Sequence, residues 1–183
     1  LLCFLQPHRQ PRMKSVYILD DHDIVRFGLE TLISASGKFR LLGSSSNLAD
    51  GLVQIDALKP DILISDMSMD DSKGLDTVRA VVQAQGERPV LVVSMHDEML
   101  YGEQVLSLGA RGYVMKEGAH ATVVPAALEV AEGRTWVSPS LRERLLGRLR
   151  GGGSPSQQGS SDAVLTQREI QVMERLGRGK NTK

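Results

Sequence analysis

Residues 60–69 read Pro-Asp-Ile-Leu-Ile-Ser-Asp-Met-Ser-Met. The run Ile62–Ser65 does not alternate between polar and apolar residues, which predicts a short strand buried on both faces of a parallel sheet. Asp66 follows the run directly, so its carboxylate would lie at the carboxyl end of that strand. Open α/β sheets place their binding sites at this edge, and the stretch therefore predicts both a fold class and the position of a site.

Four other short runs have the same apolar character, and helical patterns separate them. The runs are Ser15–Leu19, Arg40–Ser44, Val90–Ser94 and Gly112–Met115. Strand and helix alternate to about residue 133. Right-handed crossovers then give a doubly wound α/β sandwich with a five-stranded parallel sheet.

Five helices are predicted from apolar residues that recur on one helical face. Asn47 is the expected N-cap of the second helix, and Gly109 is the expected C-cap of the fourth. Pro125 falls near the start of the fifth, where proline is best tolerated. The faces expected to be buried are Val25, Leu29, Leu32 and Ile33; Leu48, Leu52, Ile55 and Leu58; Thr77, Val78, Val81 and Val82; Leu100, Val105, Leu106 and Leu108; and Val123, Ala127 and Val130.

Composition restricts the partners and the setting of this chain. The 22 basic and 22 acidic residues balance, so the basic excess typical of a nucleic-acid-binding domain is absent and any such contact would come from a local patch. Cys3 is the one cysteine and has no internal partner for a disulfide, which is consistent with a reducing cytoplasmic setting. No apolar run approaches the ~20 residues of a membrane helix, so no membrane contact is expected.

The sequence divides into five parts of different character. Residues 14–135 carry the alternating strands and helices. Residues 151–163 are rich in Gly, Ser, Gln and Pro, which predicts a flexible linker. The other parts are a tail or extension at 1–13, with Met13 as the expected natural start, a connector helix at 136–150 with an apolar Leu stripe, and a short helical segment at 164–183.

Three carboxylates follow the predicted strands at the same sheet edge. Asp20 and Asp21 follow the first strand, and Asp66 follows the third. Crowded carboxylates repel one another unless a cation lies among them, and oxygen ligands of this kind favour Mg²⁺. Ser94 ends the fourth strand and Lys116 follows the fifth, which adds a hydroxyl and an ammonium group. A carboxylate nucleophile, a metal site, a hydroxyl and an ammonium group together suit acceptance of a phosphoryl group as an acyl phosphate.

These motifs resemble the receiver domain of two-component response regulators over about residues 14–135. The matching segments are the acidic pair in residues 18–22, the strand and loop in residues 60–69 with Gly74, Val92–Ser94, and residues 109–116, which hold an aromatic residue and a lysine. The resemblance implies a flavodoxin-like receiver with strand order 2-1-3-4-5. It also implies that the protein catalyses only its own phosphorylation and dephosphorylation, on Asp66, and is otherwise not an enzyme.

The resemblance further implies a role for each residue of the site. Asp66 would be the nucleophile that takes the phosphoryl group from a sensor histidine kinase. Mg²⁺ would be bound by Asp21, Asp66 and the backbone carbonyl of Ser68, with Asp20 assisting. Lys116 would pair with a phosphoryl oxygen.

Two further residues would form the switch. Ser94 would move toward the phosphoryl group and let Tyr113 swing inward. The sequence also departs from the family, because many relatives have proline where Asp23 and Asp70 stand here, and Asp71 follows Asp70. We expect this extra negative charge to adjust phosphoryl or metal binding without abolishing it.

Residues 165–173 resemble the first helix of a LuxR-type helix-turn-helix domain, and residues 179–183 resemble the turn before its next helix. The resemblance implies a DNA-binding transcription regulator of the NarL/FixJ class that forms a homodimer when phosphorylated. The recognition helix is not among the 183 residues, so we expect this chain by itself to bind no specific DNA sequence. Two alternatives stay open: a receiver that acts through protein contacts alone, and an enzyme that uses the carboxylates for phosphatase chemistry.

Overall fold

The computed structural model describes residues 12–150, so the predicted flexible linker and the helix-turn-helix segment lie outside the described residues. Three of the five strands have the predicted bounds, and the first two are slightly longer than predicted. The elements are β1 Lys14–Leu19, α1 Asp23–Ala35, β2 Phe39–Ser45, α2 Leu48–Leu58, β3 Ile62–Ser65, α3 Leu75–Gln85, β4 Val90–Ser94, α4 Glu98–Ser107, β5 Gly112–Met115, α5 Ala119–Ala131 and α6 Pro139–Arg150.

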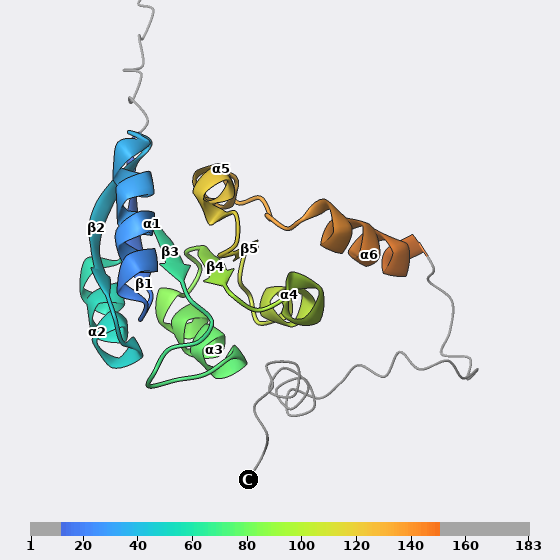
Figure 1. Cartoon of the computed structure of the whole chain (residues 1–183), viewed down its shortest axis with the longest axis horizontal. Coiled ribbons are helices and arrows are strands. Elements are labelled where there is room, and N and C mark those ends of the chain that lie inside the picture. Colours follow the sequence, from blue (N-terminus) through green and yellow to red (C-terminus); the bar gives the residue numbers. More distant parts are fainter. Residues whose placement is uncertain (1–11, 151–183) are drawn as a thin grey trace, which may run out of the picture. The chain divides into compact units, whose positions relative to one another are not determined.

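All neighbouring strands are parallel, and their order is β2-β1-β3-β4-β5, which confirms the predicted topology (Figure 1). Helices α1 and α5 cover one face of the sheet, while α2, α3 and α4 pack against the other. The order reverses direction between β1 and β3, so the carboxyl ends of these two strands lie side by side. This is the switch point at which such sheets bind their ligands.

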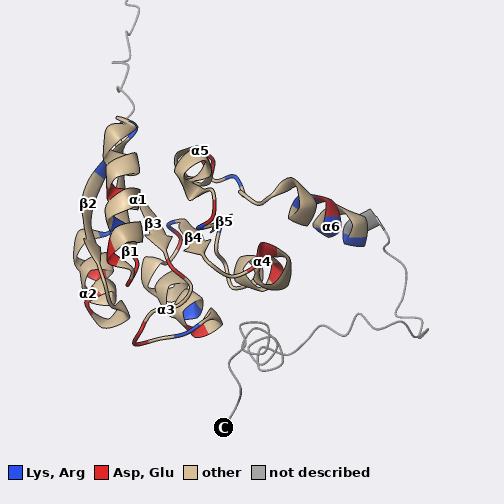
Figure 2. Cartoon of the chain, in the orientation of Figure 1, with Lys and Arg blue, Asp and Glu red and all other residues tan. Residues whose placement is uncertain are grey.

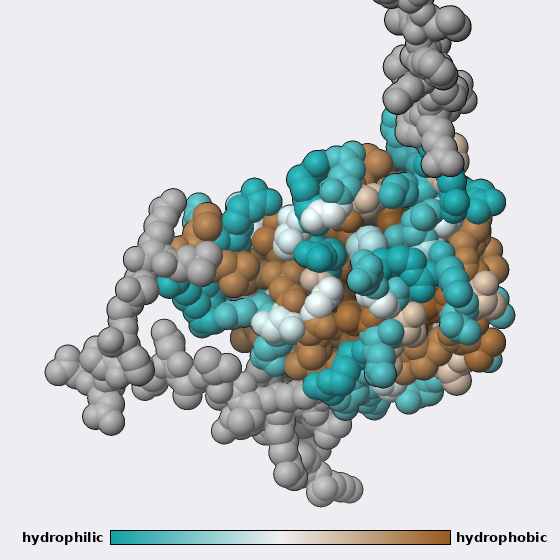
Figure 3. All heavy atoms as spheres, turned by 180° about the vertical axis from the view of Figure 1, so that it is seen from behind, coloured by the Kyte–Doolittle hydropathy of each residue, from teal (hydrophilic) through white to brown (hydrophobic). Residues whose placement is uncertain are grey.

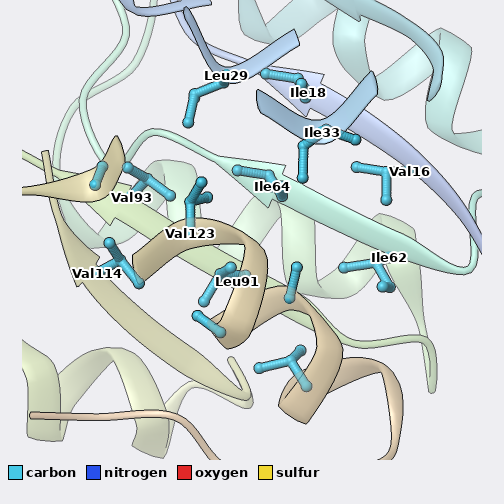
Figure 4. Packing of buried hydrophobic residues seen from close by; sticks show 14 of the residues in the cluster. Val16, Ile18, Leu29, Ile33, Ile62, Ile64, Leu91, Val93, Val114 and Val123 are labelled. Carbon is cyan, nitrogen blue, oxygen red and sulfur yellow. The ribbon is translucent and has the colours of Figure 1, made fainter. Parts of the chain in front are cut away.

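The core between the sheet and the α1–α5 layer consists mainly of branched aliphatic side chains, with Phe39 and several alanines (Figure 4). The strands contribute alternate residues to this layer, as the period of two requires. From β3, Ile62 and Ile64 point into it, and Leu29 and Ile33 of α1 meet them from the helix side. On the opposite face, Gly51 lets α2 approach β1, because a Cβ atom there would lie 2.5 Å from Leu19 Cδ1.

One predicted helix cap is confirmed and the other is displaced by one residue, since Leu108 is the C-cap of α4 and Gly109, with a φ of 106°, follows it. Asn47 caps α2 by accepting a hydrogen bond from the amide of Asp50, as predicted. The prediction that Leu58 and Leu100 are buried is wrong, because their exposed fractions are 41% and 43%. In α4 the buried positions are Glu98, Tyr101, Gly102 and Val105, and Val105 is the one among them that the apolar pattern predicts. A glutamate, a tyrosine and a glycine carry little weight in such a pattern, so the predicted face overlaps the observed one only in part.

The connector is joined to the sheet before its helix begins. Trp136 forms a parallel bridge with Gly112, and α6 then starts at Pro139, three residues later than predicted. Proline is favoured at the first position of a helix. Leu141 is fully buried against Gly102 of α4, where a Cβ atom would lie 2.5 Å from Leu141 Cδ2.

Charged side chains of both signs occur along α6 (Figure 2). The face seen in Figure 3 likewise mixes hydrophilic and hydrophobic residues. Scattered exposed apolar side chains are ordinary for a folded domain. Within residues 12–150 no helix combines the length and the apolar character needed to cross a membrane.

Asp61 ties the start of β3 to the start of β1. Its carboxylate accepts hydrogen bonds from the Ser15 amide and the Ser15 hydroxyl, both at 2.7 Å, and its own amide donates to Ser15 Oγ at 3.0 Å. Burial opposes ionisation, but these hydrogen bonds, with the charges of Arg12 and Lys14, outweigh it and hold the pKa of Asp61 below its ordinary value. The ionised form therefore stabilises the fold.

We predict that Asp61→Asn lowers the free energy of unfolding at pH 7 by about 1–2 kcal/mol, since a charged acceptor is lost. A depressed pKa contributes stability above the unfolded value, near pH 4, and loses it as the pH falls through the folded value. The difference between the variant and the wild type should therefore shrink below about pH 4 in urea unfolding. Asp56→Asn, an exposed site with the same charge change, is the control. An identical pH dependence in both variants would contradict this account.

Candidate functional site

The predicted carboxylates meet at the carboxyl edge of the sheet. One oxygen each from Asp20, Asp21 and Asp66, together with a ring nitrogen of His22, lie within 4.8 Å of one another. The Asp66 amide donates to the Leu19 carbonyl at 2.7 Å, which continues the β1–β3 pairing one residue beyond the strands. Asp66 is thereby fixed beside the acidic pair. The side chain of Asp20 is fully buried and that of Asp66 is 4% exposed.

Lys116 brings a positive charge into this cluster. Its Nζ lies 2.6 Å from Asp66 Oδ2 and 2.8 Å from Asp20 Oδ2, and the side chain is 3% exposed. The amide of Lys116 donates to the Ser94 carbonyl at 2.8 Å, which places it level with the end of β4. The structure therefore brings Lys116 to the two carboxylates, as the sequence predicts.

Ser94 and Tyr113 lie in a second, adjoining network. Ser94 Oγ accepts the amide of His96 at 3.1 Å, and the Tyr113 hydroxyl donates to the His96 carbonyl at 2.9 Å. Both side chains are buried, so the aromatic ring already points inward here. Burial raises the pKa of the Tyr113 hydroxyl above its ordinary value, although a hydrogen bond with Ser94 opposes this. The tyrosine therefore stays neutral at physiological pH.

The electrostatics of Asp66 reflect burial against a neighbouring cation. Desolvation by burial raises the pKa of Asp66, the hydrogen bond and charge of Lys116 lower it, and the charge of Asp20 raises it again, with a net upward shift. Burial thus prevails over the ion pair. A charged Asp66 is costly to the folded chain unless further positive charge is supplied.

The donor set fits a hard cation. Asp20 Oδ2 and Asp21 Oδ1 are buried and accept no hydrogen bond, although Lys116 and His22 lie close to them. Buried carboxylate oxygens without a hydrogen-bond donor are costly, and a cation would satisfy them. Oxygen ligands of this kind suit Mg²⁺.

Two histidines contact the site that are not among its predicted catalytic or metal-binding residues. His22 Nδ1 lies 2.7 Å from Asp21 Oδ1 and 3.8 Å from Asp66 Oδ2. His96 Nε2 lies 3.0 Å from the Ser68 hydroxyl, which links the loop after β4 to the loop after β3. Their positions directly after Asp21 and two residues after Ser94 were the available signals. Loop residues at such positions are usually solvated, and the sequence did not distinguish the two cases.

Comparison with known proteins agrees with this geometry. Residues 16–127 match the family model described as the response regulator receiver domain. The probable transcriptional regulatory protein NarL of Mycobacterium tuberculosis is 33% identical over 172 residues, which cover 94% of this chain and 77% of that protein. The transcriptional regulatory protein DegU of Brevibacillus brevis is 26% identical and covers 90% of this chain and 75% of its own length.

A solved structure leads to the same conclusion. The signal receiver domain of the putative response regulator NarL from Mycobacterium tuberculosis superposes with a TM-score of 0.62 at 32% identity, covering 68% of this chain and all of that domain. The family match spans more than half of the chain and includes β1, β3, β4 and β5, whose ends carry the clustered residues. The chain belongs to the response regulator receiver domain family.

Proposed function

We propose that Asp66 accepts a phosphoryl group from a sensor histidine kinase, and that this modification controls transcription. The observation that supports this best is the placement of Asp66, a buried carboxylate held between the Asp20–Asp21 pair and the ammonium group of Lys116. A receiver domain implies a partner kinase. The relatives NarL and DegU are named as transcriptional regulators, which supports the same output for this chain.

In this proposal Mg²⁺ is held by Asp21, Asp66 and the backbone carbonyl of Ser68, with Asp20 assisting. When bound, it supplies positive charge that neutralises the phosphoryl oxygens and the crowded carboxylates. The three carboxylates, which the one ammonium group of Lys116 does not balance, favour such an ion. The Ser68 amide donates to Asp66 Oδ1 at 3.2 Å, which keeps this loop next to the acceptor.

The transfer step is an in-line displacement on phosphorus. A carboxylate oxygen of Asp66 attacks, a P–O bond forms as the P–N bond of a phosphohistidine breaks, and the imidazole leaves with its electron pair and takes up a proton. Lys116, already within hydrogen-bond distance of Asp66, pairs with a phosphoryl oxygen. Catalysis of this kind depends on positioning and on charge stabilisation, and both are built into the site before the donor arrives.

The switch in this proposal involves Ser94 and Tyr113. Ser94 Oγ turns toward the phosphoryl group and gives up its hydrogen bond with the His96 amide. Because Tyr113 is already buried, we propose that phosphorylation fixes this inward position. A new hydrogen bond then biases an existing two-state equilibrium. Phosphorylated chains form a homodimer, which would bring two DNA-binding domains to two half-sites.

The first test is chemical. Incubation with Mg²⁺ and acetyl phosphate should add the mass of one phosphoryl group, and Asp66→Asn should abolish this addition because the nucleophile is removed. Intact-protein mass spectrometry measures it. Asp70→Asn, an exposed carboxylate in the same loop, is the matched control and should still be modified. Modification that survives in Asp66→Asn would refute the assignment.

A second prediction concerns Lys116. Lys116→Met should lower the free energy of unfolding by about 3–5 kcal/mol in EDTA, because two buried carboxylates lose their cation. Adding Asp66→Asn to this variant should restore part of the loss, since one of those charges is removed. Urea unfolding of the single and double variants measures the coupling. Lys38→Met, at an exposed lysine, controls for the loss of one positive charge, and a loss in Lys116→Met no larger than in this control would contradict the ion-pair account.

A third prediction separates DNA-dependent from DNA-independent output. When the 183-residue chain is used to select binding sites from a random DNA library, no sequence should be enriched, because major-groove recognition needs a recognition helix. A chain extended to the length of its relatives should enrich a site with two-fold symmetry. Enrichment by the short chain would contradict the first expectation. Failure of the extended chain would favour a receiver that acts through protein contacts alone.

A further inference from the structure

The loop between β3 and α3 contains a tight acidic turn. Met69 and Ser72 are joined by two backbone hydrogen bonds, of 2.7 and 3.2 Å, and Asp70 and Asp71 lie between them. Figure 2 shows acidic residues in this loop between β3 and α3. Ser68, whose carbonyl is a ligand in the proposed magnesium site, directly precedes this turn. The position of that carbonyl therefore depends on how the turn is held.

Two anchors fix the base of the turn. Met67 and Met69 are buried in the core, and the Thr77 hydroxyl donates to Ser72 Oγ at 3.0 Å from the first turn of α3. The tip projects beyond these contacts, and both of its carboxylates are solvent-exposed.

Asp71 attaches this tip to a different part of the fold. Its two carboxylate oxygens accept the amide of Leu48 at 3.0 and 2.9 Å, and Oδ2 also accepts the amide of Ala49 at 3.2 Å. These are the first two amides of α2, and helix N-termini leave such amides without internal partners. Asn47 caps the next amide, that of Asp50, so Asp71 completes the cap from 23 residues away.

The surroundings of Asp71 favour the ionised form of its carboxyl group. The hydrogen bonds from Leu48 and Ala49 lower the pKa of this carboxyl below its ordinary value, and the positive end of the helix dipole favours a carboxylate at that place. Asp70, the adjacent residue, is also acidic and exposed, but its carboxylate accepts no hydrogen bond within residues 12–150. Two neighbouring aspartates thus differ in one respect, the attachment to α2.

We propose that Asp71 is a positioning residue for the magnesium site, because its attachment to the start of α2 holds the loop that presents the Ser68 carbonyl. This inference rests on the proposed function, since it takes Ser68 as a metal ligand. It also gives a role to a departure from the family pattern. Where many relatives have a proline at position 70, this chain has no ring to stiffen the loop and fastens the tip through a side chain instead.

The test is the Mg²⁺ affinity of the whole chain, followed by NMR through the backbone amide shifts of Asp66 and Ser68 during a titration with MgCl₂. Asp71→Ala should raise the dissociation constant about fivefold, equivalent to about 1 kcal/mol, which is the usual scale of a lost cap. Asp70→Ala removes the same charge from the same turn, so its effect on the constant measures the contribution of charge alone and should be clearly smaller than that of Asp71→Ala. Asp71→Asn should lie between, because its amide oxygen can still accept one of the hydrogen bonds.

The possible outcomes distinguish the positioning role of Asp71 from the existence of the magnesium site. Equal constants for Asp71→Ala and Asp70→Ala would overturn the positioning role, even if Asp71→Ala lowers the unfolding temperature, because the residue would then only cap α2. A wild type that shows no Mg²⁺-dependent shifts would refute the magnesium site, and this inference with it. Weaker binding in Asp71→Ala alone, with Asp71→Asn intermediate, would support the proposal.

Discussion

Three carboxylates lie within a few ångströms of one another at one edge of the sheet, and the ammonium group of Lys116 makes this arrangement tolerable. Charges of the same sign repel one another in a buried site, and the ion pairs with Lys116 offset part of this repulsion. The fold brings Lys116 in from β5, on the far side of β4, while the carboxylates come from β1 and β3. Parallel pairing of four strands is thus needed to bring these charges together.

A single lysine does not fully compensate for the acidic cluster. The pKa of Asp66 remains raised, and two buried oxygens on Asp20 and Asp21 have no hydrogen bond. Any cation that binds only the folded chain stabilises it, and the stabilisation grows with the logarithm of the ratio of its concentration to its dissociation constant once that ratio exceeds one. The excess negative charge that destabilises this edge in the cation-free protein is therefore also the charge that attracts a cation to it. Strain of this kind at a sheet edge is a common property of functional sites.

The sequence was sufficient for the sheet but not for contacts between loops. The predicted bounds of three strands agree with the structure at both ends, because short apolar runs bounded by polar residues can form few other structures. These strands are Ile62–Ser65, Val90–Ser94 and Gly112–Met115. Two contacts could not be predicted from apolar patterns: that of His96 with Ser68, and that of Asp71 with the start of α2. Each joins segments that are distant in sequence, and neither His96 nor Asp71 belongs to a periodic pattern. Leu100 shows the opposite error, since a leucine was assumed to be buried where the helix buries Tyr101 and Gly102.

The connector is hydrogen-bonded to β5 at Tyr113, and this arrangement has a physical consequence. The amide of Tyr113 donates to the Trp136 carbonyl at 2.9 Å, while buried Glu98 accepts the amide of Ser138 at 2.9 Å. Leu141 then packs against α4. The same tyrosine thus contacts the connector through its backbone and the His96 loop through its hydroxyl. A displacement of β5 at Tyr113 cannot leave the connector unchanged, because the hydrogen bond with Trp136 must shift or break. One series of contacts from the acidic edge to the connector therefore runs through this residue.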